Sequence, residues 1–127
     1  MPAYDSSRFN PPAPIAQVTL RNPDTGLSLT DVPMLLDTGA DISLIPAFAA
    51  DAIGLTRIRG KEYELQGFGG GLSTAAATTG ELLFCRRTFS GQFLIVDEPV
   101  GILGRNVLNA IPLVLHGPRL EWEELQS

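Results

Sequence analysis

Cysteine and histidine are almost absent from this chain of 127 residues, which has one of each. A single cysteine excludes an internal disulfide framework. One cysteine and one histidine also cannot supply the ligand cluster that holds a structural zinc ion. Cys85 ends the apolar run Leu82-Leu83-Phe84-Cys85, so we expect a buried, unreactive thiol and no metal site.

Basic residues are few as well. The chain has 9 lysines and arginines against 14 acidic residues, a net charge of −5, and the basic residues form no cluster. We therefore expect neither nucleic acid nor an anionic membrane as a partner. No apolar run is long enough for a transmembrane helix, and residues 1–5 do not begin a basic and then apolar signal sequence. We accordingly expect a cytoplasmic location.

The length of the chain suits one domain and is too small for a two-lobed enzyme. Residues 1–14 are polar and rich in proline, which predicts a flexible N-terminal arm. Residues 15–127 are expected to form the folded domain.

Residues 32–39 combine an expected apolar strand with an aspartate directly after it. Residues 32–36 are Val-Pro-Met-Leu-Leu, and Asp37-Thr38-Gly39 follows directly. A carboxylate at the end of such a strand is costly to desolvate unless it is hydrogen-bonded or neutralised, and function is the usual reason to keep one there. Thr38 offers a hydroxyl and Gly39 allows a sharp turn, so the two residues can hold Asp37 in one orientation.

The same tripeptide also occurs at residues 24–26. There it belongs to the polar cluster Arg21-Asn22-Pro23-Asp24-Thr25-Gly26, which lies between two alternating segments. That pattern is typical of a hairpin loop. Because Asp and Gly are common turn residues, Asp-Thr-Gly alone does not define a site, and its surroundings must decide.

Two further blocks distinguish the copy at residues 37–39. Residues 65–71 are Leu-Gln-Gly-Phe-Gly-Gly-Gly, and residues 101–108 are Gly-Ile-Leu-Gly-Arg-Asn-Val-Leu. Together with Leu-Leu-Asp-Thr-Gly-Ala-Asp at residues 35–41, they resemble the retropepsin family of aspartic proteases in order and approximate spacing. The resemblance covers about residues 15–116. It implies an all-β fold, a closed β-barrel or sandwich with one or two short helices, active as a C2 homodimer.

The periodicity of the chain is that of strands joined by turns. Apolar and polar residues alternate on both sides of the turn at residues 22–26, which predicts a hairpin with one buried face. Gly54 predicts the end of a short helix over residues 47–53. The other expected elements are strands at residues 32–36, 61–66 and 72–78, an extended segment at 42–45, strands at 81–85 and 92–96 around a turn at 86–91, a short helix at 106–109, and a strand, turn and strand over 113–122.

The resemblance implies roles for residues near Asp37, which with Thr38 and Gly39 would form the catalytic group. The glycine-rich tip is expected to act as a flap that closes over a peptide. Ala40 and Asp41 are expected to bind the substrate backbone as an added strand would. The expected flap contacts are Gly67, Phe68, Gly69 and Gly70, and the expected apolar subsite residues are Leu44, Ile45, Phe68 and Ile102.

Arg105 and the C-terminal strand are expected to support the dimer. In the family, the arginine at this position pairs with the second aspartate of Asp-Thr-Gly-Ala-Asp, so we expect Arg105 to pair with Asp41. Leu113 and Leu115 are expected at the dimer interface, with His116 nearby as a strand residue and not a catalyst. Short retropepsins end with one strand there, so residues 117–127 form a C-terminal extension that departs from the family pattern.

The expected chemistry needs two carboxylates, one ionised and one protonated, which activate a water molecule between them. This chain offers one credible aspartate of that kind, Asp37, so the second must come from another copy. We therefore expect a homodimer that cleaves a peptide or protein substrate and needs no cofactor.

Two other interpretations remain. The first is a peptide-docking or dimerisation module with little turnover. Loss of Asp37, Thr38 or Gly39 would favour it, and none of the three is lost. A structural β-domain without any site would leave the Asp37 strand end, the glycine-rich block and the block at residues 101–105 as three coincidences.

Overall fold

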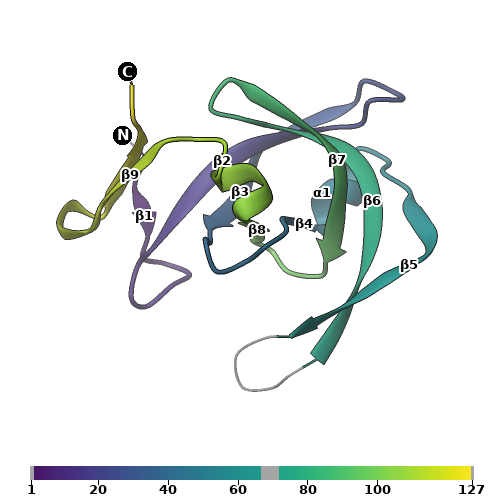
Figure 1. Cartoon of the computed structure of the whole chain (residues 1–127), viewed down its shortest axis with the longest axis horizontal. Coiled ribbons are helices and arrows are strands. Elements are labelled where there is room, and N and C mark those ends of the chain that lie inside the picture. The colour runs from purple at the N-terminus through teal and green to yellow at the C-terminus, as the bar shows by residue number, and fades with distance from the viewer. Residues whose placement is uncertain (1, 67–71, 127) are drawn as a thin grey trace.

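The computed structural model describes residues 2–66 and 72–126 (Figure 1). These residues form a mostly β fold with two short helices, α1 (Ala47–Ala52) and α2 (Arg105–Leu108). The strands are β1 (Tyr4–Asp5), β2 (Ala13–Arg21), β3 (Ser28–Leu36), β4 (Leu44–Pro46), β5 (Arg57–Gln66), β6 (Leu72–Phe84), β7 (Arg87–Val96), β8 (Gly101–Leu103), β9 (Leu113–His116) and β10 (Glu121–Glu124).

The main sheet closes on itself. Its strand order is β1-β2-β3-β8-β4-β7-β6-β5, and β2 also pairs with β6. The strands β2, β3, β8, β4, β7 and β6 therefore form a closed ring, with β1 and β5 attached outside it. The expected all-β closed barrel with two short helices is confirmed.

The core follows from the alternation of side chains along the strands. In β2, Ala16, Val18 and Leu20 are buried, as are Val32 and Met34 in β3. Their side chains join one hydrophobic cluster with residues of β6, β7, β8 and both helices. A smaller cluster of Ala75, Ala77 and Leu94 lies between β6 and β7.

The β2–β3 hairpin is confirmed, and β3 is longer than expected. The register shifts between Val18 and Leu20, and Asp31 has a φ of +57°, which marks a bulge opposite the shift. Because the strand continues through this bulge, the second arm of the expected hairpin and the expected strand at residues 32–36 form one strand, β3, which ends next to Asp37.

Helix α1 ends as the sequence predicts. Gly54 follows it with a φ of +70°, and Leu55 N–H donates to the carbonyl of Ala50 at 2.9 Å. Within the described ranges, no helix has the length and apolar character needed to cross a membrane.

The turn between β6 and β7 differs from the expectation. Phe84 pairs directly with Arg87, so the turn contains only Cys85 and Arg86, and the expected turn at residues 86–91 is wrong. Both turn residues have positive φ, 52° and 60°, as a two-residue type I′ hairpin turn requires. Cys85 is therefore a half-buried turn residue rather than a fully buried strand residue.

The two ends of the chain lie together (Figure 1). β9 and β10 form an antiparallel hairpin, which confirms the expected strand, turn and strand. Tyr4 N–H donates to the carbonyl of Leu120 at 2.7 Å, and Trp122 N–H donates to the carbonyl of Pro2 at 3.0 Å. The start of the expected flexible arm is thus paired with β10 and, through β1, with β2. Its proline content gave no sign of the pairing with β10, because β10 lies more than a hundred residues away along the chain.

Candidate active site

Asp37 lies where β3 ends. β3 runs parallel to β8, with Leu35 opposite Ile102 and Leu36 opposite Leu103. Asp37 N–H extends this pairing by donating to the carbonyl of Leu103 at 3.0 Å. The strand pair therefore places the half-buried Asp37 at the edge of the barrel core, as the apolar run before it predicts.

The turn after Asp37 folds back onto it. Gly39 N–H donates to Asp37 Oδ1 at 2.9 Å, and Ala40 N–H donates to the main-chain carbonyl of Asp37 at 3.2 Å. A Cβ atom at position 39 would lie 3.1 Å from Oδ1, so a larger residue would crowd the carboxylate. The glycine thus permits the close approach that orients Asp37.

Thr38 contributes through its main chain. Its carbonyl accepts a hydrogen bond from Arg105 Nη1 at 2.7 Å, and the residue itself is exposed. Its hydroxyl forms no hydrogen bond within the part of the chain that the structure describes. The role expected for the Thr38 side chain in orienting Asp37 stays a prediction.

Gly104 lets the block at residues 101–108 pack against the loop after Asp37. A Cβ atom on Gly104 would lie 2.5 Å from the carbonyl oxygen of Ile42 and 3.0 Å from that of Ala40. Arg105 N–H donates to the Ala40 carbonyl at 2.8 Å. The loop after Asp37 therefore packs directly against the Gly104 backbone, and any side chain at position 104 would clash with it.

Ser43 links the same two segments from inside. Its side chain is fully buried, its Oγ accepts the Gly104 N–H at 3.0 Å, and its hydroxyl donates to Asn106 Oδ1 at 2.7 Å. Sequence reasoning missed Ser43 and Asn106 as site residues. The one available signal was a small polar residue inside the apolar run at residues 42–45.

Arg105 does not pair with Asp41. Its guanidinium donates to the Thr38 carbonyl, and no ion pair joins Arg105 to Asp41 in residues 2–66 and 72–126. The expected pair is therefore wrong for this chain on its own. Arg105 is a support of the Asp37 turn, because it holds the peptide unit directly after the aspartate.

A cavity of about 400 Å³ opens beside the β3–β8 pair. Its walls come from the N-terminal segment, β3, and the segment that leads into β8. The lining residues are Arg8, Phe9, Leu35, Glu98, Pro99, Val100, Gly101 and Ile102. Ile102 thus lines a cavity, and its expected contact with substrate stays a prediction. Sequence reasoning missed the contribution of Arg8 and Phe9 to the cavity wall.

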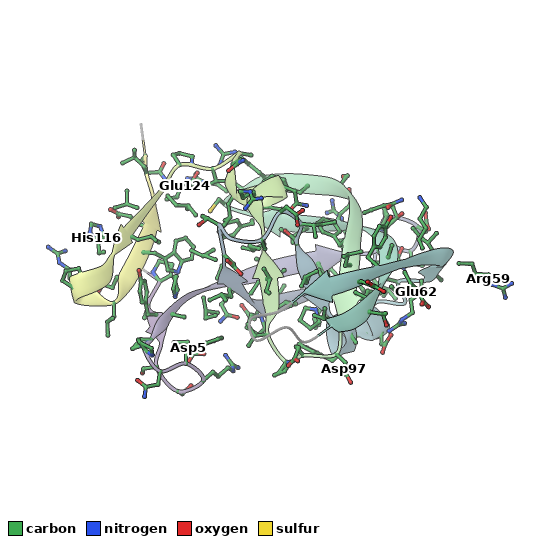
Figure 2. The ribbon with its side chains drawn as sticks, turned by 60° about the horizontal axis from the view of Figure 1, so that its bottom comes forward. Asp5, Arg59, Glu62, Asp97, His116 and Glu124 are labelled. Atoms are coloured by element: carbon green, nitrogen blue, oxygen red, sulfur yellow. The ribbon has the colours of Figure 1, made fainter. Side chains whose placement is uncertain are left out.

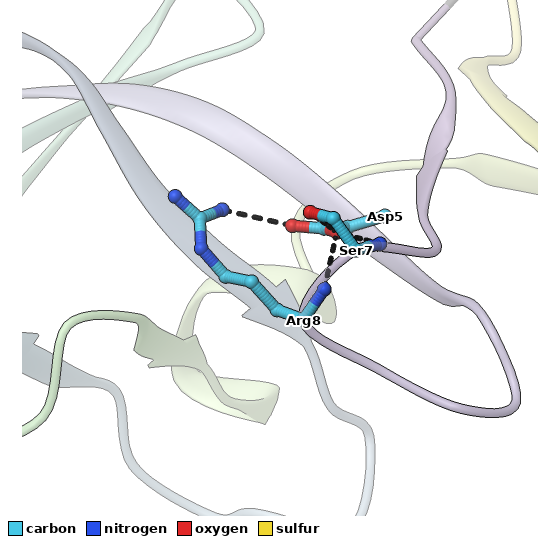
Figure 3. A network of polar contacts seen from close by, with 3 residues as sticks. All are labelled: Asp5, Ser7 and Arg8. Carbon is cyan, nitrogen blue, oxygen red and sulfur yellow. Dashed lines mark hydrogen bonds and ion pairs between the residues drawn. The ribbon is translucent and has the colours of Figure 1, made fainter.

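A network of polar contacts holds Arg8 at this cavity (Figure 3). Asp5 Oδ1 accepts hydrogen bonds from the N–H groups of Ser7 and Arg8 at 2.8 and 2.9 Å, and Asp5 Oδ2 accepts from Arg8 Nη1 at 2.8 Å. The Arg8 N–H, and after it the Ser7 hydroxyl, lower the pKa of Asp5 to about 2. Asp5 thus stays charged and anchors this wall over the ordinary pH range.

The expected subsite at Leu44 and Ile45 is not found. Ile45 is fully buried in the barrel core, so its expected role is wrong. Leu44 packs against the smaller hydrophobic cluster and does not line the cavity. Ala40 and Asp41 lie on the loop after Asp37, half-buried and exposed respectively, and their contact with substrate stays a prediction.

The strands of the expected flap are present. β5 and β6 pair antiparallel from Glu62 opposite Ala76 to Gln66 opposite Leu72, and they extend away from the barrel (Figure 1). The expected flap contacts Gly67, Phe68, Gly69 and Gly70 lie outside the described residues, so their roles stay predictions.

Leu113 and Leu115 both belong to β9, where Leu113 is half-buried and Leu115 is 57% exposed. Their expected place at a dimer interface stays a prediction.

Among the described residues, no group of three or more His, Cys, Asp or Glu side chains could hold a metal ion. Burial, followed by the nearby Glu124 charge, raises the pKa of the Cys85 thiol to about 11, which agrees with an unreactive cysteine.

Comparison with known proteins gives a consistent result. The profile of the family described as retroviral aspartyl protease matches residues 12–116. Pol polyproteins of equine infectious anemia virus, from strain Wyoming and isolate 1369, are 32% identical to the chain over 111 residues. The match covers 81% of this chain but only 9% of each polyprotein.

A solved protease structure is similar to most of the chain. The EIAV protease, complexed with the inhibitor HBY-793, superimposes with a TM-score of 0.57 at 28% sequence identity. The superposition covers 77% of this chain and 86% of the EIAV chain.

Proposed function

The chain belongs to the retroviral aspartyl protease family, and we propose that it hydrolyses peptide bonds as a homodimer in which each copy supplies one Asp37 to the catalytic pair. The observation that carries this proposal is the setting of Asp37. The aspartate ends a strand of the barrel, and the Gly39 N–H orients its carboxylate at 2.9 Å.

The chemistry follows from two carboxylates in different charge states. The ionised carboxylate takes a proton from water, and the protonated one donates a hydrogen bond to the carbonyl oxygen of the scissile peptide. The water oxygen attacks the carbonyl carbon, and protonation of the amide nitrogen then breaks the C–N bond. Because two carboxylates about 3 Å apart share one proton, the pair titrates with two macroscopic pKa values and activity peaks between them.

A single chain supplies one half of this arrangement. Asp24, in the other Asp-Thr-Gly copy, is exposed on the β2–β3 loop, and among the described residues no strand pairs with this loop as β8 pairs with the end of β3. A second copy related by a twofold axis would bring a second Asp37 to the first.

The proposed substrate class rests on the cavity beside the β3–β8 pair, whose lining includes Leu35, two residues before Asp37. Its lining is mainly apolar, with Phe9, Leu35, Pro99, Val100 and Ile102, which suits a hydrophobic side chain. An extended peptide crossing the Asp37 turn would pair with the backbone and place a side chain there. We therefore propose peptides with hydrophobic residues beside the cleaved bond as substrates.

The test is hydrolysis of a mixed peptide library between pH 4 and pH 8, with sedimentation of the same samples. We expect the wild type to cleave, and Asp37→Asn to lose at least about 10³-fold in rate because the catalytic pair is broken. Asp24→Asn is the matched control, since it changes the same residue of the same tripeptide, and we expect its rate to stay within about twofold of wild type.

Two outcomes would overturn the proposal. A well-formed wild-type dimer without cleavage at any pH would favour the docking module. Equal cleavage by wild type and Asp37→Asn would place the chemistry elsewhere.

A further inference from the structure

The cavity beside the β3–β8 pair has one wall from outside the segment that the family profile matches. The profile matches residues 12–116, whereas Arg8 and Phe9 come before this segment and still line the cavity. The rest of the lining comes from β3, β8 and the segment between β7 and β8. Figure 2 labels Asp5 and Asp97, which mark the two segments, and both lie along its lower edge. The N-terminal segment thus gives this chain a cavity wall of its own.

The loop that carries this wall is anchored where it begins and where it ends. β1 pairs with β2, with Asp5 opposite Ala13, so residues 6–12 form a loop between two paired strands. β1 is also held from the C-terminal hairpin, because Tyr4 N–H donates to the carbonyl of Leu120 at 2.7 Å. The fold therefore sets the place of the loop beside the cavity.

The Asp5 carboxylate fixes the first half of the loop. Its side chain is only 14% exposed. It accepts four hydrogen bonds, from the Ser7 N–H, the Ser7 hydroxyl, the Arg8 N–H and Arg8 Nη1, at 2.8 to 2.9 Å (Figure 3). Hydrogen bonds to an ionised acceptor are short and strong. Because Phe9 directly follows Arg8, the same network sets the position from which the Phe9 side chain starts.

The charges at the cavity favour an uncharged occupant. The Arg8 guanidinium is matched by Asp5 at 2.8 Å. Glu98 also lines the cavity, and no ion pair joins it to another residue in the described ranges. An acidic side chain placed beside Glu98 would be repelled. The aromatic member of the described lining is Phe9, which is half-buried and so keeps part of its surface open to an occupant.

We propose that Phe9 is a specificity-determining residue that selects an aromatic side chain of the substrate, and that Asp5 is the positioning residue that holds Phe9 at the cavity. Two aromatic rings attract one another in offset-stacked or edge-to-face arrangements, in addition to the effect of burying them. A cavity of about 400 Å³ is within the size range of ligand pockets. The inference rests on the proposed function, because it names the substrate class of the same site: peptides with an aromatic rather than an aliphatic residue beside the cleaved bond.

Two peptides that cannot be hydrolysed test this preference without requiring catalysis. In each peptide a methylene-amine group replaces the central peptide bond. One peptide has phenylalanine on both sides of this group and the other has leucine, so the same side chain reaches the cavity in either direction of binding. We expect calorimetry to give a dissociation constant about fivefold lower for the phenylalanine peptide with the wild-type chain.

Phe9→Leu removes the ring and keeps an apolar wall. We expect the two dissociation constants of this variant to agree within about 1.5-fold, because the contact between aromatic rings is lost. Phe48→Leu is the matched control, since Phe48 is 51% exposed on α1 and does not line the cavity. We expect it to keep the wild-type preference. Misfolded protein would lower the number of binding sites for both peptides alike, so it would not change the ratio of the two constants.

A double-mutant cycle tests the role of Asp5. Asp5→Ala removes the acceptor of the loop hydrogen bonds, and we expect the preference to fall to about twofold because Phe9 is no longer held in place. If Asp5 acts through Phe9, the double variant with Phe9→Leu has the same ratio as Phe9→Leu alone. Ser7→Ala removes only the hydroxyl bond, and we expect it to keep most of the preference.

The outcomes separate this inference from the proposed function. Tighter binding of the phenylalanine peptide, lost in Phe9→Leu and kept in Phe48→Leu, supports the inference even if the chain cleaves no peptide. Cleavage of the peptide library by a wild-type chain that prefers neither peptide, or whose preference survives in Phe9→Leu, overturns the inference and leaves the enzyme intact. Failure of the wild type to bind either peptide also overturns it. An unchanged preference in Asp5→Ala overturns the positioning role of Asp5.

Discussion

Asp-Thr-Gly occurs twice in this chain, and the two copies fold in different ways. At residues 24–26 the bonds are local. Gly26 N–H donates to the Asn22 carbonyl at 2.8 Å, Leu27 N–H donates to Thr25 Oγ1 at 3.2 Å, and Gly26 adopts a φ of +78°. The three residues of this copy bond only to near neighbours, and Asn22 anchors the turn to the end of α1 by donating to the carbonyl of Ile53 at 2.9 Å.

At residues 37–39 the decisive bonds come from far along the chain. Arg105 donates to the Thr38 carbonyl across 67 positions, and Asp37 N–H pairs with Leu103. Gly39 does not adopt a positive φ and serves instead to let its N–H approach the Asp37 carboxylate. The same three residues therefore make a turn when only their neighbours contact them, and a candidate catalytic group when a second strand packs behind them.

The largest expected effect comes from disturbing the contact between Gly104 and the loop after Asp37. Gly104→Ala would place a Cβ atom 2.5 Å from the Ile42 carbonyl oxygen, and we expect it to lower the free energy of unfolding by about 3 kcal/mol. Gly26→Ala has open space around its Cβ atom and should cost only about 1 kcal/mol, for the positive φ. Urea denaturation of both variants measures the difference, and equal losses would contradict the contrast between the two copies.

A smaller effect is expected from the hydroxyl groups near each copy. Ser43→Ala leaves the Gly104 N–H buried without its acceptor, which should cost about 1–3 kcal/mol of unfolding free energy. Thr25→Ala removes an exposed hydroxyl that accepts from Leu27, and its cost should stay within about 0.5 kcal/mol. If the Thr25 variant loses as much as the Ser43 variant, the contrast between an exposed local bond in the first copy and a buried long-range bond in the second is wrong.

A double-mutant cycle tests the role of Arg105. Because Arg105 bonds to Thr38 and not to Asp41, the unfolding free energies of Arg105→Gln and Asp41→Asn should add, with a coupling below about 0.5 kcal/mol. The cycle is measured by urea denaturation of each variant at one common protein concentration, at which sedimentation gives the same oligomeric state for all of them. A coupling above about 1 kcal/mol would instead be evidence for the Arg105–Asp41 ion pair that the family resemblance implied.

The smallest expected effect concerns pH and the base of the hairpin that carries residues 24–26. Arg21 Nε donates to Glu81 Oε1 at 2.7 Å, and this hydrogen bond holds the pKa of Glu81 below its usual value of 4.5. Because the folded pKa is the lower one, the stabilisation is complete above pH 4.5 and is lost as the pH falls through the folded value. We therefore expect the free energy of unfolding to decrease slightly less from pH 6 to pH 3 in Glu81→Gln than in wild type. An identical fall would show that this half-buried pair contributes nothing to the hairpin.

Much of the barrel was predictable from local pattern. The alternation in β2, the Gly54 stop after α1 and the strand that ends at Asp37 each depend on near neighbours. The β6–β7 turn was not, because Cys85 and Arg86 adopt positive φ without the usual Asn or Gly. Gly91 suggested a turn, but it pairs with Gly80 inside the sheet.

The candidate site divides in the same way. The sequence alone determined which aspartate carries the proposed chemistry and which blocks accompany it, because strand periodicity and short motifs are local properties. Only the tertiary structure decided that Ser43 and Gly104 support the Asp37 turn, that Arg105 bonds to Thr38, that Arg8 reaches the cavity, and that the N-terminal segment pairs with β10. These contacts join segments far apart along the chain. Their geometry depends on how the closed barrel brings its strands together, which no local propensity encodes.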